Sequence, residues 1–153
     1  MLTQTFESEN KWYSLEYPRV WEMEVIENIP SFFDPFAGKG AVQVLSVNCS
    51  GKPEPEIIQN YPFLNGKTLG DKMLIFLHSQ QVNIKSAELS IVTKGNMEMI
   101  PFEYSSDGSF FMAVMMEENG ILLLVLYNST EVPDKEEASI ISAIIQSIKF
   151  TQQ

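Results

Sequence analysis

Residues 110–127 read FFMAVMMEENGILLLVLY, two runs that are apolar at nearly every position on either side of Asn119-Gly120. An Asn-Gly pair readily takes the positive φ angles that a tight β-hairpin requires. A strand with one wet face alternates apolar and polar residues, so runs without alternation predict strands covered on both faces. We therefore expect Phe110–Met116 and Ile121–Tyr127 to pair antiparallel in the middle of a sheet.

The hairpin pattern continues towards the N-terminus. Gly95-Asn96 and Asp107-Gly108 separate further apolar stretches, and residues 86–91 alternate between polar and apolar side chains. This spacing predicts a four-stranded antiparallel meander over Ser86–Tyr127, whose first strand begins at Ser86.

Two helices are predicted to cover the sheet. The first, from Thr68 to about Val82, begins with Thr68-x-x-Asp71, a variant of the capping box. The second begins at Asp134-x-x-Glu137. Its apolar face is formed by Ala138, Ile141, Ile144, Ile145 and Ile148. Because each helix has one apolar stripe, we expect one helix on each face of the sheet.

The first half of the chain adds strands at Lys11–Tyr17, Trp21–Val25 and Ala41–Asn48, whereas the proline-rich segment Gly51–Gly66 predicts a long connection or a short helical turn. The predicted order is βββ-α-ββββ-α. The predicted fold class is α+β, an antiparallel sheet of about six to seven strands in an α/β/α sandwich. A length of 153 residues suits a single domain over residues 1–153, with its folded core at about residues 5–150.

Two short motifs carry a family resemblance. Trp12–Trp21, WYSLEYPRVW, resembles the opening aromatic strand, Tyr-Pro turn and Trp of the PsbP-like superfamily, and Ile144–Phe150, IIQSIKF, resembles its closing helix and end. That superfamily includes a subunit of the oxygen-evolving complex of photosystem II, the Ran nucleotide-release factor and bacterial families of unknown function. The resemblance implies the same fold and a binding or assembly role, and it implies no catalytic residue and no particular partner.

The chain is acidic, with 10 basic against 20 acidic residues and a formal net charge of −10. Nucleic-acid binding draws most of its affinity from Lys and Arg that neutralise phosphates, so we expect no nucleic-acid partner. The same charge disfavours an anionic membrane surface, and the longest apolar run, Ile121–Tyr127, is far shorter than the roughly 18 residues of a membrane span. We expect no membrane partner either.

The N-terminus lacks the basic start and the apolar stretch of a secretory signal. The only cysteine, Cys49, cannot form an internal disulfide, which agrees with a reducing compartment. We therefore expect a cytoplasmic protein.

Catalytic and metal-binding patterns are sparse. Gly66-Lys67-Thr68 matches the end of a phosphate-binding loop, but Tyr61 occupies the position of that motif's first glycine, so a capped helix start is the better interpretation. One histidine, His78, and one cysteine cannot form a zinc site, and the carboxylate clusters lack the spacing of a calcium loop. We expect no enzyme activity, no metal and no cofactor.

The segment Ile29–Gly40, IPSFFDPFAGKG, places three phenylalanines among loop-forming prolines and glycines. Aromatic side chains in a loop either fold back onto the core or stay exposed to meet a partner, and we favour the first because exposed aromatic patches are uncommon. Tyr61-Pro62-Phe63-Leu64 allows the same two interpretations. The second interpretation makes Phe32, Phe33, Phe36, Tyr61 and Phe63 candidate partner-binding residues.

Two functional hypotheses remain. The leading one is a non-catalytic binding or accessory domain that engages a protein partner, for example an immunity or inhibitor protein whose acidity complements a basic toxin. The alternative is a small-molecule carrier or an enzyme with a pocket between sheet and helix, lined by Met97, Met99, Met112 and Met115 or Met116. A large pocket with converging polar groups would favour the alternative.

Overall fold

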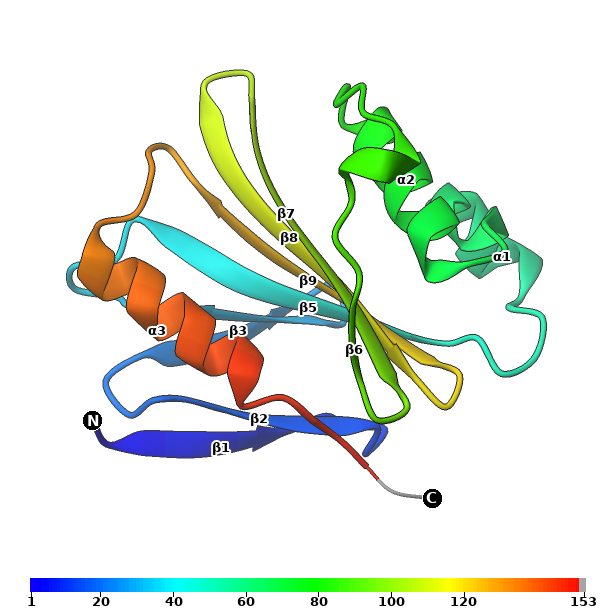
Figure 1. Ribbon diagram of the computed structural model, residues 1–153. Coiled ribbons are helices and arrows are strands. Elements are labelled where there is room, and N and C mark those ends of the chain that lie inside the picture. Colours follow the sequence, from blue (N-terminus) through cyan, green and yellow to red (C-terminus); the bar gives the residue numbers. More distant parts are fainter. Residues whose placement is uncertain (152–153) are drawn as a thin grey trace.

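The computed structural model describes residues 1–151, which form two antiparallel sheets and three α-helices (Figure 1). The large sheet has the strand order β3-β4-β5-β9-β8-β7-β6, and the small sheet has the order β1-β2-β10. The strands are β1 (Thr3–Glu7), β2 (Tyr13–Pro18), β3 (Glu22–Ile26), β4 (Ile29–Phe33), β5 (Gly40–Asn48), β6 (Val92–Lys94), β7 (Met97–Ser106), β8 (Ser109–Glu118), β9 (Ile121–Ser129) and β10 (Lys149–Phe150). The helices are α1 (Pro55–Asn60), α2 (Leu69–Ser79) and α3 (Lys135–Gln146), with 3-10 turns η1 (Pro62–Asn65) and η2 (Ser86–Glu88).

The middle of the large sheet is as predicted. β9 pairs with β8 on one side and with β5 on the other, so both unbroken apolar runs lie inside the sheet. Asp107-Gly108 and Asn119-Gly120 have positive φ at both residues and close the two hairpins. The predicted fold class is confirmed.

The interpretation of residues 29–40 as a loop is wrong for its first part. Ile29–Phe33 is strand β4, which pairs with β3 and β5. The turn between β3 and β4 is Glu27-Asn28, both with positive φ, so a hairpin forms without the glycine that usually marks one.

Two other predictions about strands need correction. Residues 86–88 form the 3-10 turn η2, and the strand at the start of the meander is only β6, Val92–Lys94. Strand β2, which covers most of the predicted strand Lys11–Tyr17, lies in the small sheet between β1 and β10 and not in the large sheet. Alternating side chains show that a strand exists but do not say which sheet it joins.

The large sheet separates two apolar cores. One face is covered by α3 together with the small sheet, and this first core contains Ile141, Ile144 and Tyr13. The other face is covered by α2 and η1, and this second core contains Met73, Leu77 and Phe63. A helix therefore covers each face, as predicted, and Figure 1 shows α2 and α3 on opposite sides of the sheet. Within residues 1–151, no helix is long and apolar enough to span a membrane.

Candidate functional site: a methionine-lined groove

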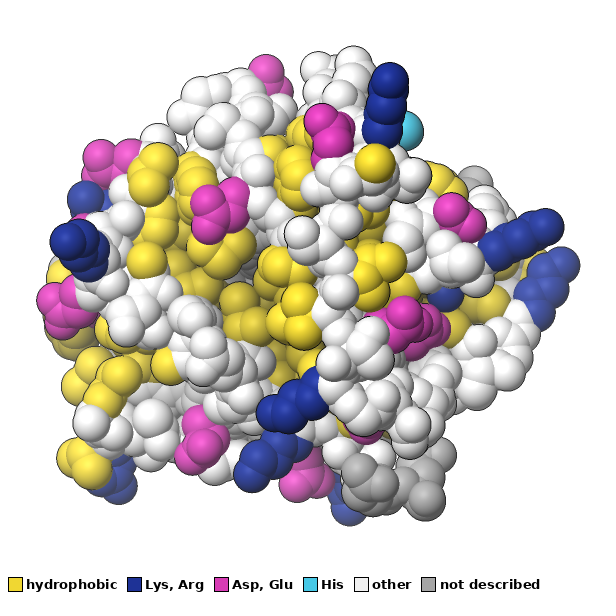
Figure 2. Space-filling model, viewed as in Figure 1, with side chains coloured by type: hydrophobic (Ala, Val, Ile, Leu, Met, Phe, Trp, Pro, Cys, Tyr) yellow, Lys and Arg dark blue, Asp and Glu magenta, His cyan; other side chains and the backbone are white. Residues whose placement is uncertain are grey.

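A groove of about 1220 Å³ runs between the β6–β7–β8 end of the large sheet and the wall formed by α3 and β10. It is open to solvent. In Figure 2, hydrophobic side chains gather in the hollow between α3 and the strands β6 and β7. The first core thus stops short of the sheet's β6 edge and leaves apolar surface uncovered.

Alternation along the strands places the methionines on the groove floor. Met97 and Met99 of β7 point to one face, while their neighbour Ile100 points to the other face and is fully buried in the second core. Register pairs Met99 with Met116 on β8, and Met112 and Val114 continue the same face. Methionine is flexible and polarisable, so a floor of this kind adapts to differently shaped apolar partners.

The opposite wall comes from the side of α3 that does not enter the core. Ala138, Ser142 and Ile145 recur at helical spacing along the groove, whereas Ile141 and Ile144 are almost fully buried and attach the helix to the sheet. Gln146 Nε2 donates to Ser142 Oγ at 3.2 Å, so these two polar groups are bonded along the helix to each other.

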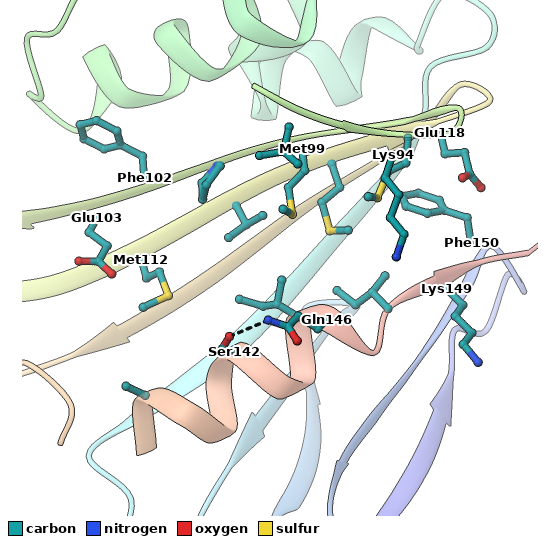
Figure 3. A pocket seen from close by; sticks show the side chains of 18 residues that line it. Lys94, Met99, Phe102, Glu103, Met112, Glu118, Ser142, Gln146, Lys149 and Phe150 are labelled. Atoms are coloured by element: carbon teal, nitrogen blue, oxygen red, sulfur yellow. Dashed lines mark hydrogen bonds between the residues drawn. The ribbon is translucent and has the colours of Figure 1, made fainter. Parts of the chain in front are cut away.

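Charged side chains mark the two ends of the groove (Figure 3). Glu103 lies at the end near the start of α3, and Lys94, Glu118 and Lys149 lie at the end near β10. The Lys94 side chain extends towards α3, while the Phe102 ring points away towards the α1–α2 side. The ion pairs within residues 1–151 are Lys39–Glu131 at 3.0 Å and Lys72–Glu117 at 3.5 Å, so none of the four groove charges is in one.

A buried carboxylate holds the start of α3 in place. Asp134 caps the helix by accepting the Glu137 N–H at 2.8 Å. Glu137 does not reciprocate as in a capping box; its side chain accepts the Tyr127 hydroxyl of β9 and, at 3.1 Å, the Lys39 N–H that precedes β5. Burial and the hydrogen bond to Glu137 raise the pKa of Tyr127 to about 12. These contacts tie the start of α3 to β9 and to the segment before β5.

Comparison with solved structures places the fold. No family model and no curated protein matches the chain. The solution structure of cyanobacterial PsbP (CyanoP) from Synechocystis has a TM-score of 0.62 at 12% identity, covering 97% of this chain and 92% of that one. This chain has a PsbP-like fold. A crystal structure from Bacteroides thetaiotaomicron has a TM-score of 0.59 at 14% identity. The match covers 100% of this chain and 50% of that protein, so this chain spans half of that protein's length.

In this PsbP-like chain the candidate aromatic residues of β4 and the following turn do not form one surface. Phe32 is fully buried in the first core, with ring centroids 5.2 Å from Phe6 and 4.9 Å from Tyr17. Phe33 is half-buried, and Phe36 alone is left in solvent, 89% exposed. The favoured interpretation, that these aromatics fold back, is confirmed for Phe32 and wrong for Phe36.

Tyr61 and Phe63 lie on the opposite side of the PsbP-like sheet. Phe63 is buried in the second core, with its ring centroid 6.0 Å from that of Phe76 in an edge-on arrangement. Tyr61 is half-buried and shares a hollow of about 290 Å³ with Ile29. The two aromatic segments therefore adjoin at Ile29, but Phe32 and Phe63 are separated by the whole sheet.

The residues that the sequence offered for catalysis or phosphate binding make contacts typical of a structural role. Thr68 is the N-cap of α2, with the Asp71 N–H donating to its Oγ at 3.0 Å, which confirms the capped helix start. His78 Nε2 lies 3.1 Å from the Ile84 carbonyl oxygen, and burial raises the pKa of Cys49, which disfavours the thiolate. Within residues 1–151, no group of three or more potential ligands could hold a metal ion.

The methionine set of the alternative hypothesis is the part that the structure assembles. Met97, Met99, Met112 and Met116 all line the groove, whereas Met115 points into the second core and is fully buried. Sequence reasoning missed the contribution of Lys94, Glu103 and the α3 residues. Period-two alternation along β7 could have placed Glu103 on the methionine face; nothing in the sequence could have shown that α3 lies opposite.

Proposed function

We propose that this chain is a non-catalytic binding domain of the accessory type, and that it holds an apolar segment of a protein partner in the methionine-lined groove. The observation that carries the proposal is the groove itself, a large open hollow lined by four methionines, Ile145 and Phe150. Soluble proteins rarely leave contiguous apolar surface uncovered unless it meets something.

The groove is poorly equipped for chemistry. Its lining in the described part of the chain contains no histidine, cysteine, aspartate or tyrosine, and its Ser142 and Gln146 are hydrogen-bonded to each other. The lining does contain Glu103, Glu118, Lys94 and Lys149, but within residues 1–151 no hydrogen bond joins any of them to Ser142, the hydroxyl of the lining. The PsbP-like fold agrees with an accessory role and assigns no partner.

A second candidate is an apolar small molecule in the same groove. The groove volume of about 1220 Å³ exceeds the roughly 300–1000 Å³ of usual ligand pockets, so a small molecule would fit with space left over. The openness to solvent and the lack of converging polar groups favour a protein segment, since small molecules are usually enclosed and oriented by a few polar contacts.

Site-specific photo-crosslinking in the source cells tests the proposal. A photoreactive phenylalanine analogue at Met99, on the groove floor, is expected to give a discrete protein adduct that mass spectrometry identifies. The matched control is the same analogue at Met23, an exposed methionine of the opposite edge strand β3. Identical adducts from both positions, or only small-molecule adducts from Met99, would rule out a protein partner in the groove.

A further inference from the structure

The groove floor runs from β8 to β6 at the edge of the large sheet. On β8, Val114 and Met116 are already covered, 3% and 2% exposed, so the accessible strip lies over β7 and β6. Neighbouring strands lie about 4.8 Å apart, and an α-helix with its side chains is about 10–12 Å in diameter. One helix beside α3 would therefore cover β7 and β6 and reach the edge of the sheet.

The length of the strip is that of three helical turns. Glu103 and Met97 stand at its two ends, six residues apart on β7, which corresponds to about 20 Å of strand. A helix covers this distance with about 13 residues. The neighbouring helix α3 has 12 residues, so a helix of similar length would lie beside it along the whole groove.

An extended peptide fits this edge less well than a helix does. Strand β6 pairs only with Met97–Met99 of β7, and the next residue whose backbone faces outward is Pro101. Proline has no N–H to donate, so a strand added along the free part of β7 would lose a hydrogen bond at its first position.

The charges at the ends of the groove indicate a direction. Glu103 stands alone at the end near Ala138, and the other end carries Lys94 and Lys149 against Glu118. A helix has a partial positive charge at its N-terminus and a partial negative charge at its C-terminus. A helix that begins at Glu103 and ends at Lys94 therefore meets the complementary sign at each end.

The overall charge limits the partner. A second copy of this chain carries the same formal charge of −10 and is repelled, whereas a basic segment is attracted. We propose that the groove takes a basic amphipathic helix of about 13 residues from a partner protein, lying parallel to α3 with its N-terminus at Glu103. This proposal rests on the groove being the binding site.

Two synthetic peptides of equal composition test it, each of about 15 Lys, Leu and Ala residues. One places its leucines at helical spacing and the other alternates them as in a strand. Fluorescence anisotropy with the intact protein is expected to show the helical peptide binding at least about tenfold more tightly, because only it presents one continuous apolar face. Equal or tighter binding of the alternating peptide, or no binding of either, would overturn the helix.

Matched substitutions locate the binding. Met99→Lys and Ser142→Lys place a cation in the groove and are expected to lower the affinity for the helical peptide at least about tenfold. Met23→Lys and Ser139→Lys, which lie outside the groove, are expected to change that affinity less than about twofold. Ser142 is exposed on α3, so its variant keeps the test valid if Met99→Lys does not fold. Equal effects in both pairs would place the peptide elsewhere.

Nitroxide labels on the peptide report its direction. A label on its first residue is expected to broaden the amide resonances of Glu103 and Ala138, and a label on its last residue those of Lys94 and Lys149. The reverse pattern would overturn the orientation.

A fluorescent fatty acid is the probe for an acyl-chain ligand. If it binds, if Met99→Lys and Ser142→Lys weaken its binding, and if neither peptide binds, the helix is refuted and the groove is an acyl-chain site. A partner crosslinked at Met99 through a strand or loop would refute the helix and leave the proposed function standing.

Discussion

Two buried tyrosine hydroxyls show how differently the same group can be placed. The Tyr127 hydroxyl donates to the buried side chain of Glu137, which also accepts the Lys39 N–H. The Tyr104 hydroxyl is buried with no hydrogen-bond partner among the described residues, although its ring stacks on Phe111 at 5.0 Å. Burial raises the pKa of Tyr104 to about 12. One hydroxyl satisfies a buried carboxylate, and the other contributes only its desolvation cost.

Tyr127→Phe and Tyr104→Phe are therefore expected to change the free energy of unfolding by different amounts, or in opposite directions. Tyr127→Phe is expected to lower the free energy of unfolding by about 1–3 kcal/mol, because it removes a donor from a buried carboxylate. Tyr104→Phe removes a group without a partner and is expected to be neutral or stabilising by up to about 1 kcal/mol. Urea denaturation of both variants measures this. A larger loss for Tyr104→Phe would mean that its hydroxyl is bonded in solution.

At the start of β5, the backbones of β5 and β9 approach each other closely. β5 begins at Gly40, opposite Ser129 on β9. A methyl group at Gly40 would overlap the carbonyl oxygen of Asn128, whereas Gly51, in the loop after β5, has nothing within 4 Å of that position. The first glycine is therefore required by packing between strands and the second is not.

The two glycines form a matched pair for substitution. Gly40→Ala is expected to cost about 1–3 kcal/mol of unfolding free energy, because β5 and β9 must separate to admit the methyl group. Gly51→Ala is expected to stay within about 0.5 kcal/mol of the parent. Thermal and urea unfolding measure both values, and equal effects would show that β5 does not approach β9 as closely as described.

At the scale of the whole molecule, the two faces of the large sheet are covered unequally. The second core closes over β7, where Ile100 and Tyr104 are buried, while the groove leaves Met97, Met99 and Pro101 of the same strand accessible. Helix α3 divides its apolar residues between these roles. Ile144 is 1% exposed in the first core, and its neighbour Ile145 is half-buried in the groove wall.

Truncation of these neighbouring isoleucines should separate core from groove. Ile144→Ala is expected to lower the free energy of unfolding by about 2–5 kcal/mol, as for a fully buried aliphatic side chain. Ile145→Ala is expected to cost about 1 kcal/mol or less, since water already reaches it, and to weaken groove ligands. Urea denaturation measures the change in unfolding free energy for both variants. A cost for Ile145→Ala equal to that for Ile144→Ala would mean that the groove is closed in solution.

Local signals in the sequence determined much of the fold. The run at 110–127 determined the two middle strands because side chains covered on both faces need no alternation, and the caps at Thr68 and Asp134 determined both helix starts because an N-cap is a contact within one turn. The cytoplasmic location and the exclusion of nucleic acid stay predictions from composition.

Only the tertiary structure decided which strands share a sheet and where apolar surface stays open. The Glu27-Asn28 turn made β4 a strand, and β2 joined the small sheet through distant partners at β10, near the other end of the chain. The methionines pointed to a pocket in the sequence, but its second wall is α3, whose start is tied by Glu137 to Lys39, 98 residues away along the chain. Alternation along a strand shows which face of the sheet each side chain points to, but it does not show whether another element covers that face.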